Sequence, residues 1–370
     1  MPERRAAATA STRARRWPLL LALVGVAGCG AKKRAAVGAG PTADGGVDAA
    51  GAAAIADDAR LPPPPPLPPL PAGLPPLPAD VAPTPAEVAL GELLFWDPRL
   101  GADGTTACAS CHAPEHGYSG TEPHPRTAAG KPSLRRAPAL VNLAWSPALG
   151  WDGRGGDFTS WLPNHVRGQL NQSLAGIAVE LDGIPGYRAH FERTEAGRSR
   201  GDTVLAALTA FVQTRYDGGS PWDLHEAAGG GDPALVAGYA LFTGKALCAS
   251  CHPPPLYTDH GFHRLGLVAS PDDGRGRADP ALGGAFATPG LRGAARRQRF
   301  FHDGSATSLA AAIAWHLDGG RGQGAAAALI DPGLPPVVLT AAERADLEAF
   351  VAALTAAGPP PTRPPLPGAP

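Results

Sequence analysis

Four of the five cysteines lie in two copies of one pentapeptide, CASCH, at residues 108–112 and 248–252. C-x-x-C-H is the attachment signal for c-type haem. Its two thiols add to the haem vinyl groups, and the histidine that follows becomes the proximal ligand of the iron. The sequence therefore predicts two covalently bound c-type haems. The thiols are Cys108, Cys111, Cys248 and Cys251, and the proximal ligands are His112 and His252.

Other uses of C-x-x-C fit this chain less well. Two C-x-x-C units that share one zinc usually lie about 15–20 residues apart, whereas these two are far apart and each carries its own histidine. A thioredoxin-like motif needs a βαβ pattern, which the sequence does not show. Disulfide bonding remains an alternative for a protein in an oxidising compartment.

The N-terminus predicts export. Five arginines precede an apolar run from Trp17 to Ala27, which is too short to span a bilayer. The run ends in Val26-Ala27-Gly28-Cys29, which resembles a bacterial lipobox. We expect residues 1–28 to be a signal peptide and Cys29 to be lipidated. The protein would then be anchored on the periplasmic side of the envelope, with the outer membrane favoured over the inner. An ordinary secretory signal with a free Cys29 is the alternative.

Residues 29–82 are rich in Ala, Gly and Pro, and cannot form a core. Their proline run at 61–78 favours polyproline II at about 3.1 Å per residue, a spacer of roughly 55 Å. We therefore expect 29–82 to be a tether. The Pro-rich tail 358–370 is expected to be disordered.

The remaining residues are enough for two domains, 83–225 and 226–357, one for each CASCH motif. The fold expected is mostly α: two cytochrome c-like domains, each wrapping one covalent haem, with long loops rich in Gly and Pro. The net charge of −1 and the pI near 6.8 give no indication of a nucleic-acid partner.

Local patterns predict four helices. Thr84 and Glu87 have capping-box spacing at the start of a helix that runs through Leu94. Asp202 or Thr203 is expected to cap a second helix, and residues 235–242 form a third. Thr340 and Glu343 open the last. The expected buried faces are Val204, Leu205, Leu208, Phe211 and Val212 in the second helix, and Leu347, Phe350, Val351 and Leu354 in the last.

Several segments around these motifs resemble the bacterial di-haem cytochrome c peroxidase superfamily, which includes the tryptophan-modifying maturase of methylamine dehydrogenase. The similar segments are distributed over nearly the whole length of 83–355. They are LGELLFWDPRL at 90–100, RRAPALVN at 135–142, WDGR at 151–154, LFTGKA at 241–246, TPGLR at 288–292 and FHDGS at 301–305.

The resemblance implies an oxidoreductase that reduces hydrogen peroxide or uses it to oxidise a partner. In the family the N-terminal haem is catalytic, and the C-terminal haem takes electrons from a small donor. A small cytochrome or copper protein would be that donor here. Trp151 matches a tryptophan that lies between the haems and offers a step for electron transfer. A plain core tryptophan is the alternative.

The chain departs from the family at the second axial ligand of the C-terminal haem. That ligand is usually Met, or Tyr in the maturase, but the only Met here is Met1. His316 occupies the matching position, so we expect His252 and His316 to ligate this iron together. Replacing Met by His lowers the haem potential. A histidine that interacts with a helix end is the alternative for His316.

A second departure concerns proton transfer at the N-terminal haem. The family places Gln and Glu above the catalytic iron, and the Glu moves the peroxide proton. Trp161 and Asn171 occupy these positions, and no Asp or Glu occurs between Phe158 and Val179. His165 is the residue of this segment that can transfer protons near neutral pH. It could replace the Glu, ligate the iron, or be a surface residue.

Two further family features are weaker in this chain. His124 lies in the loop where peroxidases carry a removable resting-state ligand, although its spacing differs from theirs. Calcium is doubtful, because Ala137 stands where calcium-binding members have Asn. Five other histidines are expected to be structural or solvent-exposed: His116, His190, His225, His260 and His263.

The sequence thus leaves two functions open. The first is a lipid-anchored di-haem peroxidase or peroxide-using oxidase. The second is a non-catalytic di-haem electron carrier that has lost its acid/base groups. An open N-terminal iron would indicate the enzyme, and a tightly closed bis-histidine iron would indicate the carrier.

Overall fold

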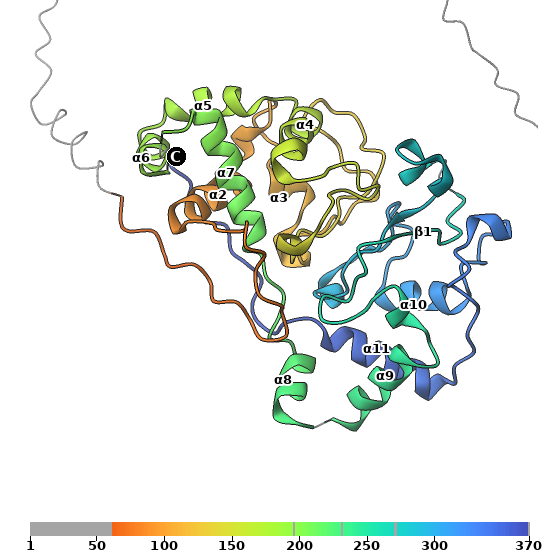
Figure 1. Cartoon of the computed structure of the whole chain (residues 1–370). Coiled ribbons are helices and arrows are strands. Elements are labelled where there is room, and N and C mark those ends of the chain that lie inside the picture. The colour runs from red at the N-terminus through yellow and green to blue at the C-terminus, as the bar shows by residue number, and fades with distance from the viewer. Residues whose placement is uncertain (1–60, 195–196, 231, 270–271, 369–370) are drawn as a thin grey trace, which may run out of the picture. The chain divides into compact units, whose positions relative to one another are not determined.

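The computed structural model describes residues 61–194, 197–230, 232–269 and 272–368 (Figure 1). The regular secondary structure of these residues is mostly helical, as the sequence predicts. Their one sheet pairs β1 (Phe262–His263) with β2 (Phe286–Ala287) in antiparallel register. The α-helices are α2 (Pro85–Trp96), α3 (Cys108–Cys111), α4 (Phe158–Leu170), α5 (Leu174–Asp182), α6 (Pro185–Thr194), α7 (Arg200–Gln213), α8 (Pro221–Ala228), α9 (Pro233–Thr243), α10 (Leu309–Leu317) and α11 (Ala341–Ala353).

A first hydrophobic core lies among α2, α5, α6 and α7, which gather in one group in Figure 1. The capping box predicted for α2 is present, with Thr84 and Glu87 each accepting from the other's backbone. Helix α7 begins earlier than predicted: Ser199 is its N-cap and accepts from the Asp202 N–H, so Asp202 occupies the first turn. The burial predicted for α7 is confirmed at four of five positions, Val204, Leu208, Phe211 and Val212, while Leu205 is only half-buried.

A second core forms around α9 and α11, which contact each other along their lengths. The predicted capping box of α11, formed by Thr340 and Glu343, is present, and all four predicted face residues are buried. Trp222 of α8 also packs in this core. The expected boundary between residues 225 and 226 therefore falls inside a helix whose tryptophan belongs to the second core.

Six helices are not among the four predicted from local patterns: α3, α4, α5, α6, α8 and α10. Of these, α4, α5, α6 and α8 mix Gly, Pro and polar residues with short apolar stretches, so their helical period is weak. Helix α4 contains Pro163 in its interior and buries only Val166 and Leu170. Helix α4 nevertheless carries His165. A helix with a weak sequence pattern therefore positions a candidate site residue.

The Pro-rich segments contact the folded chain where the structure describes them. In residues 61–82, the Ala72 carbonyl accepts from Gly219 N–H and the Pro76 carbonyl accepts from Trp145 Nε1. In the tail, Leu366 packs on the first core and the Pro367 carbonyl accepts from Arg99. Proline carbonyls without helical partners remain free acceptors. These parts of the expected tether and disordered tail thus lie against the protein.

The predicted signal peptide, Cys29 and the tether up to residue 60 lie outside the described residues. Among the helices that the structure does describe, none is long and apolar enough to cross a membrane.

Candidate haem sites

The first CASCH motif forms the short helix α3, and His112 follows directly as its C-cap. The His112 side chain is buried, and its Nδ1 lies 2.9 Å from the carbonyl oxygen of Pro138. Burial lowers the pKa of His112 to about 4, so the imidazole is neutral near pH 7. If Nδ1 donates to Pro138, the lone pair of Nε2 is left for a metal.

His165 of α4 lies opposite His112. The two ring centroids are 6.2 Å apart and the ring planes are inclined by 53°. Trp161 stacks on His165 at 5.6 Å and 27°. Burial, then the nearby His112 and Arg154, lower the pKa of His165 to about 3. His165 is half-buried, and its ring faces those of His112 and Trp161.

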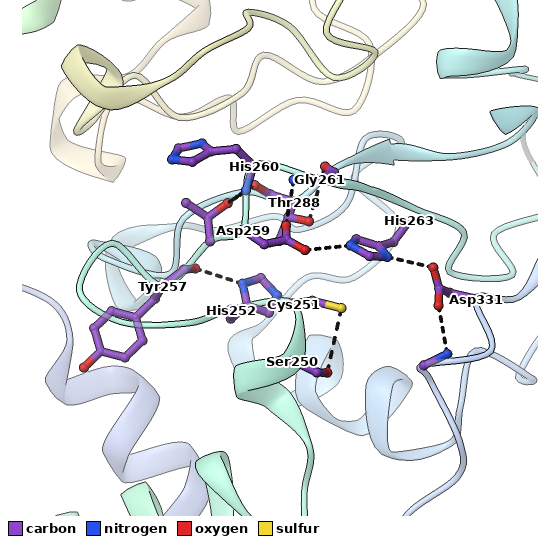
Figure 2. Close-up of polar contacts among 12 residues, drawn as sticks. Ser250, Cys251, His252, Tyr257, Asp259, His260, Gly261, His263, Thr288 and Asp331 are labelled. Carbon is purple, nitrogen blue, oxygen red and sulfur yellow. Dashed lines mark hydrogen bonds and ion pairs between the residues drawn. The ribbon is translucent and has the colours of Figure 1, made fainter. Parts of the chain in front are cut away.

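The second CASCH motif forms a 3₁₀ turn at Cys248–Ser250, followed by His252. Its Nδ1 lies 2.9 Å from the Tyr257 carbonyl oxygen, the same arrangement as at His112 (Figure 2). His316 on α10 lies opposite, with ring centroids 6.5 Å apart and planes at 69°. The Nδ1 of His316 lies 2.8 Å from the carbonyl oxygen of Ala312, one turn earlier in its helix.

These separations fit two imidazoles on opposite sides of one metal ion. A metal–nitrogen bond is about 2.0–2.1 Å, so with about 1.2 Å from nitrogen to ring centre, two trans rings should have centroids about 6.4 Å apart. The observed 6.2 and 6.5 Å both agree with this value. The His252–His316 pairing expected from the sequence is therefore geometrically possible. The same geometry applies to His112 and His165.

The wall of the second site also suits a porphyrin, because it is largely apolar. His252 and His316 share one cavity with Cys248 and Cys251. Aliphatic and aromatic side chains line it, including Phe242, Leu291, Leu309, Ile313, Leu317 and Val351. The four cysteines of the two motifs are free thiols, which does not support the disulfide alternative.

His263, next to the second motif, has a more specific environment than the structural role expected for it. Its Nε2 lies 2.9 Å from Asp259 and its Nδ1 lies 2.7 Å from Asp331 (Figure 2). A hydrogen bond with the Cys251 sulfur, followed by those with Asp331 and Asp259, raises the pKa of His263 to about 10. Haem attachment at Cys251 would remove the first cause but leave both carboxylates. Each ring nitrogen of His263 is hydrogen-bonded to a carboxylate, so neither nitrogen is left for a metal. The cluster therefore resembles a structural ion-pair network more than a metal site.

Trp151 is buried and lines the cavity of the second site. Its Nε1 donates to the Arg136 carbonyl at 2.8 Å, and its own carbonyl accepts from Ala287 N–H at 2.8 Å. The Arg136 guanidinium lies 5.2 Å from the centre of a Trp151 ring. A tryptophan beside a haem cavity, fixed at three points, can act as a step in electron transfer.

The structure also shows the surroundings of the other residues that the family resemblance singles out. Trp161 is stacked on His165, and Asn171 ends α4 in the left-handed conformation with φ 51°. Neither replaces the family's Glu. His124 is exposed, with Nδ1 3.1 Å from the Ser133 carbonyl oxygen, and it does not face His112. Ala137 is buried and offers no side-chain oxygen for calcium.

Sequence reasoning missed a group of cationic residues near Trp151. Arg135 forms ion pairs with Asp152, at 2.8 Å, and with Asp272. Arg136, Arg297 and His302 are buried nearby. Their segments are far apart in the chain, and no short spacing connects them. The available signals were the RRAPALVN segment, which contains Arg135 and Arg136, and the FHDGS motif, which contains His302.

Comparison with known proteins identifies the family of this chain. A family model described as di-haem cytochrome c peroxidase matches residues 85–229. The methylamine utilization protein MauG of Methylorubrum extorquens is 35% identical over 280 residues, covering 72% of this chain and 78% of that protein. Cytochrome-c peroxidase IdrP1 of Denitromonas iodatirespirans is 34% identical over 347 residues, covering 82% and 89%.

Solved structures show the same fold. A MauG-like protein associated with microbial copper homeostasis aligns with a TM-score of 0.67 at 26% identity, covering 79% of this chain and 94% of its own. The diheme peroxidase BthA from Burkholderia thailandensis aligns with a TM-score of 0.61 at 23% identity, covering 79% and 96%.

The chain belongs to the di-haem cytochrome c peroxidase family, as its motifs predict. Family membership implies two c-type haems and an oxidoreductase of the peroxidase-like class.

Proposed function

We propose that this protein is a peroxide-dependent oxidoreductase with two covalent c-type haems, attached at Cys108 and Cys111 and at Cys248 and Cys251. It would reduce hydrogen peroxide with electrons from a small cytochrome or copper protein, or use peroxide to oxidise a partner. Bound haem iron supplies the redox chemistry. The observation that carries the proposal is the pair of facing histidines at each motif.

In this proposal His112 and His165 ligate the N-terminal iron at rest, and His252 and His316 ligate the C-terminal iron. The 6.2 Å separation supports ligation by His165. A histidine that only transferred a proton would need room for peroxide between its ring and the metal. His165 must therefore leave the iron before peroxide can bind.

The surroundings of His165 support its release. Neither of its ring nitrogens has a hydrogen-bond partner among the described residues, and its contact with Trp161 is a stacking contact. His165 is the group between Phe158 and Val179 whose ordinary pKa lies near neutral pH, and its release from the buried position would remove the main cause of its lowered pKa. It would accept the peroxide proton, the role that Glu has in the family.

A non-catalytic electron carrier is the second candidate. Two closed histidine pairs and the loss of the family's Glu at Asn171 favour it. The two functions differ in whether His165 leaves the iron on the timescale of a reaction with peroxide.

We also propose that export and lipidation at Cys29 place the protein on the periplasmic side of the bacterial envelope, where haem is attached to C-x-x-C-H motifs. The described part of the Pro-rich segment would then connect the anchor to the first core.

The test is stopped-flow mixing of the protein with peroxide. A binding-competent state populated at about 0.1–10% slows the binding of peroxide by the same fraction, so peroxide should bind to His165→Ala about 10- to 1,000-fold faster. The proton-transfer step that follows should be about 10²- to 10⁴-fold slower in this variant, because its proton acceptor is gone. His124→Ala is the matched control, because His124 is exposed, and should react as wild type does.

Two results would overturn the proposal. Equal rates of peroxide binding to His165→Ala and to wild type would mean that His165 does not block the iron. If neither protein reacts with peroxide faster than free haem does, the protein is a non-catalytic electron carrier and the proposal is wrong.

A further inference from the structure

Trp161 of α4 lies one helical turn before His165, so the two side chains share one face of the helix. The indole stacks on the His165 imidazole, with ring centroids 5.6 Å apart and planes at 27°. The Arg154 guanidinium also contacts this indole, 5.4 Å from the centre of a ring. Trp161 is half-buried, and its Nε1 has no hydrogen-bond partner among the described residues. The position of the indole therefore depends on packing.

Two glycines of the preceding loop form a slot for this indole. A methyl group on Gly155 would lie 2.7 Å from the ring, and one on Gly150 would lie 3.3 Å from its edge. Carbon atoms in optimal contact are about 3.5–4.0 Å apart, so a side chain at Gly155 would overlap the indole. Because both positions lack a side chain, Trp161 lies directly on the backbone of the loop.

The loop that forms the slot is itself held in place. Leu149 and Gly155 exchange two backbone hydrogen bonds, of 2.6 and 3.2 Å. The Arg275 side chain, from a distant segment, donates to the carbonyls of Asp152 and Gly153 at 3.1 and 2.8 Å. Because the backbone is fixed in this way, a side chain added at Gly155 should displace the indole and not the loop.

We propose that Trp161 holds His165 in place opposite His112 and thereby controls the fraction of molecules in which His165 has left the iron. Trp161 is then a positioning residue that acts through His165. The proposal rests on the proposed function, in which His165 must leave before peroxide binds. Among the described residues, no polar group holds the His165 ring, so its stacking contact with the seated indole is the restraint. The family resemblance places Gln at this position, so the restraint is a feature of this chain.

The test is stopped-flow measurement of peroxide binding to the two-haem protein. Loss of a stacked aromatic pair changes an equilibrium by about 2- to 13-fold, so peroxide should bind to Trp161→Ala faster than to wild type by this factor. Trp161→Phe keeps an aromatic ring in the slot and should stay close to wild type. EPR of the ferric protein gives a second readout. The high-spin fraction of one haem should rise in Trp161→Ala, while the signal of the His252–His316 site persists.

Gly155→Ala provides an independent arm, because it displaces the indole and leaves Trp161 and His165 unchanged. It should also speed the binding of peroxide. Gly156→Ala is the matched control, since its added methyl group would lie 3.9 Å from Ser160 Oγ, an ordinary contact. In the double variant, Gly155→Ala should add nothing to Trp161→Ala, because the side chain through which it acts is already gone.

The outcomes separate this proposal from the proposed function. If peroxide binds to His165→Ala no faster than to wild type, the proposed function fails and the restraint by Trp161 fails with it. If His165→Ala binds peroxide faster but Trp161→Ala binds it at the wild-type rate or more slowly, the restraint alone is wrong. Equal effects of Gly155→Ala and Gly156→Ala, or additive effects in the double variant, would also overturn the restraint, by indicating a general loosening of the loop.

Discussion

The two histidine pairs have nearly equal separations but differ in how the second histidine is held. At the C-terminal site, Nδ1 of His316 is fixed to the Ala312 carbonyl. At the N-terminal site, His165 has a stacked Trp161 and no corresponding hydrogen bond. An anchored imidazole is fixed in tautomer and orientation and is a better ligand. The comparison therefore indicates one permanent distal ligand and one that can be replaced.

The loops that follow His112 and His252 also differ in how firmly neighbouring arginines are held. The Arg292 side chain donates to the Pro255 carbonyl, in the loop that follows His252, and pairs with buried Asp223. In the N-terminal site, the buried Arg136 near the corresponding loop has no carboxylate partner among the residues described. The C-terminal site is thus the more tightly held of the two.

The largest effect is expected for Asp223→Ala. Removing one partner of a buried ion pair costs about 3–5 kcal/mol, because the remaining charge is left unpaired. We expect the free energy of unfolding in urea to fall by this amount and the spectrum of one haem to change. Asp232→Ala, which removes an exposed cap of α9, should cost about 1 kcal/mol. Equal losses for the two variants would show that the pair does not hold the site.

Pro163→Ala tests whether α4 is the element that releases His165. An interior proline removes one helical hydrogen bond and costs about 3 kcal/mol. Restoring that bond should stiffen α4 and slow the reaction with peroxide by up to about 100-fold, which corresponds to about 2.8 kcal/mol.

Gly168→Ala is the control for Pro163→Ala. Gly168 lies beyond His165 in α4, and a methyl group there meets open space. It should stabilise the helix by about 0.5–1 kcal/mol without restoring the missing bond. If both variants slow the reaction equally, general helix stability and not the proline controls release.

His316→Met tests whether His316 is the second ligand at the C-terminal site. Met ligation raises the haem potential, so one midpoint potential should rise and an absorption band at about 695 nm should appear. The potential of the other haem should not change. If neither the spectrum nor the potential changes, His316 is not the ligand.

The smallest effect is expected for the pH dependence of stability that Asp97 in the first core produces. Asp97 is buried, and hydrogen bonds from Arg99 and Tyr187 lower its pKa although burial alone would raise it. A lowered folded-state pKa gives stability above the unfolded value of about 3.9, which is lost as pH falls through the folded value. Asp97→Asn should therefore reduce the loss of stability in acid, measured by urea unfolding from pH 5 to pH 2. An unchanged pH profile would contradict this.

The parts that could be predicted from the sequence depend on short spacings. The CASCH motifs, the capping boxes of α2 and α11 and the buried face of α11 each occupy one continuous segment. His316 could be proposed because the family resemblance places the second axial ligand of the C-terminal haem at its position. The cap of α7 was misplaced because Ser199, Asp202 and Thr203 are all good caps, and tertiary packing decides among them.

The remaining parts depend on contacts between distant segments. Nothing in the sequence shows that His165 faces His112, because α4 is weakly encoded and lies between Gly-rich loops. The environment of His263 requires Asp331, which is distant from it in the sequence. Such features follow from packing in three dimensions and have no local pattern.

EPR spectroscopy of the ferric protein tests the central claim most directly, namely that each iron has two histidine ligands and that one of the four histidines, His165, is replaceable. We predict two low-spin signals in wild type and in His124→Ala. In His165→Ala, one of them should be converted to a high-spin signal that responds to hydrogen peroxide, while the signal of the His252–His316 site persists. A high-spin signal from one haem in wild type, or two unchanged low-spin signals in His165→Ala, would contradict the account.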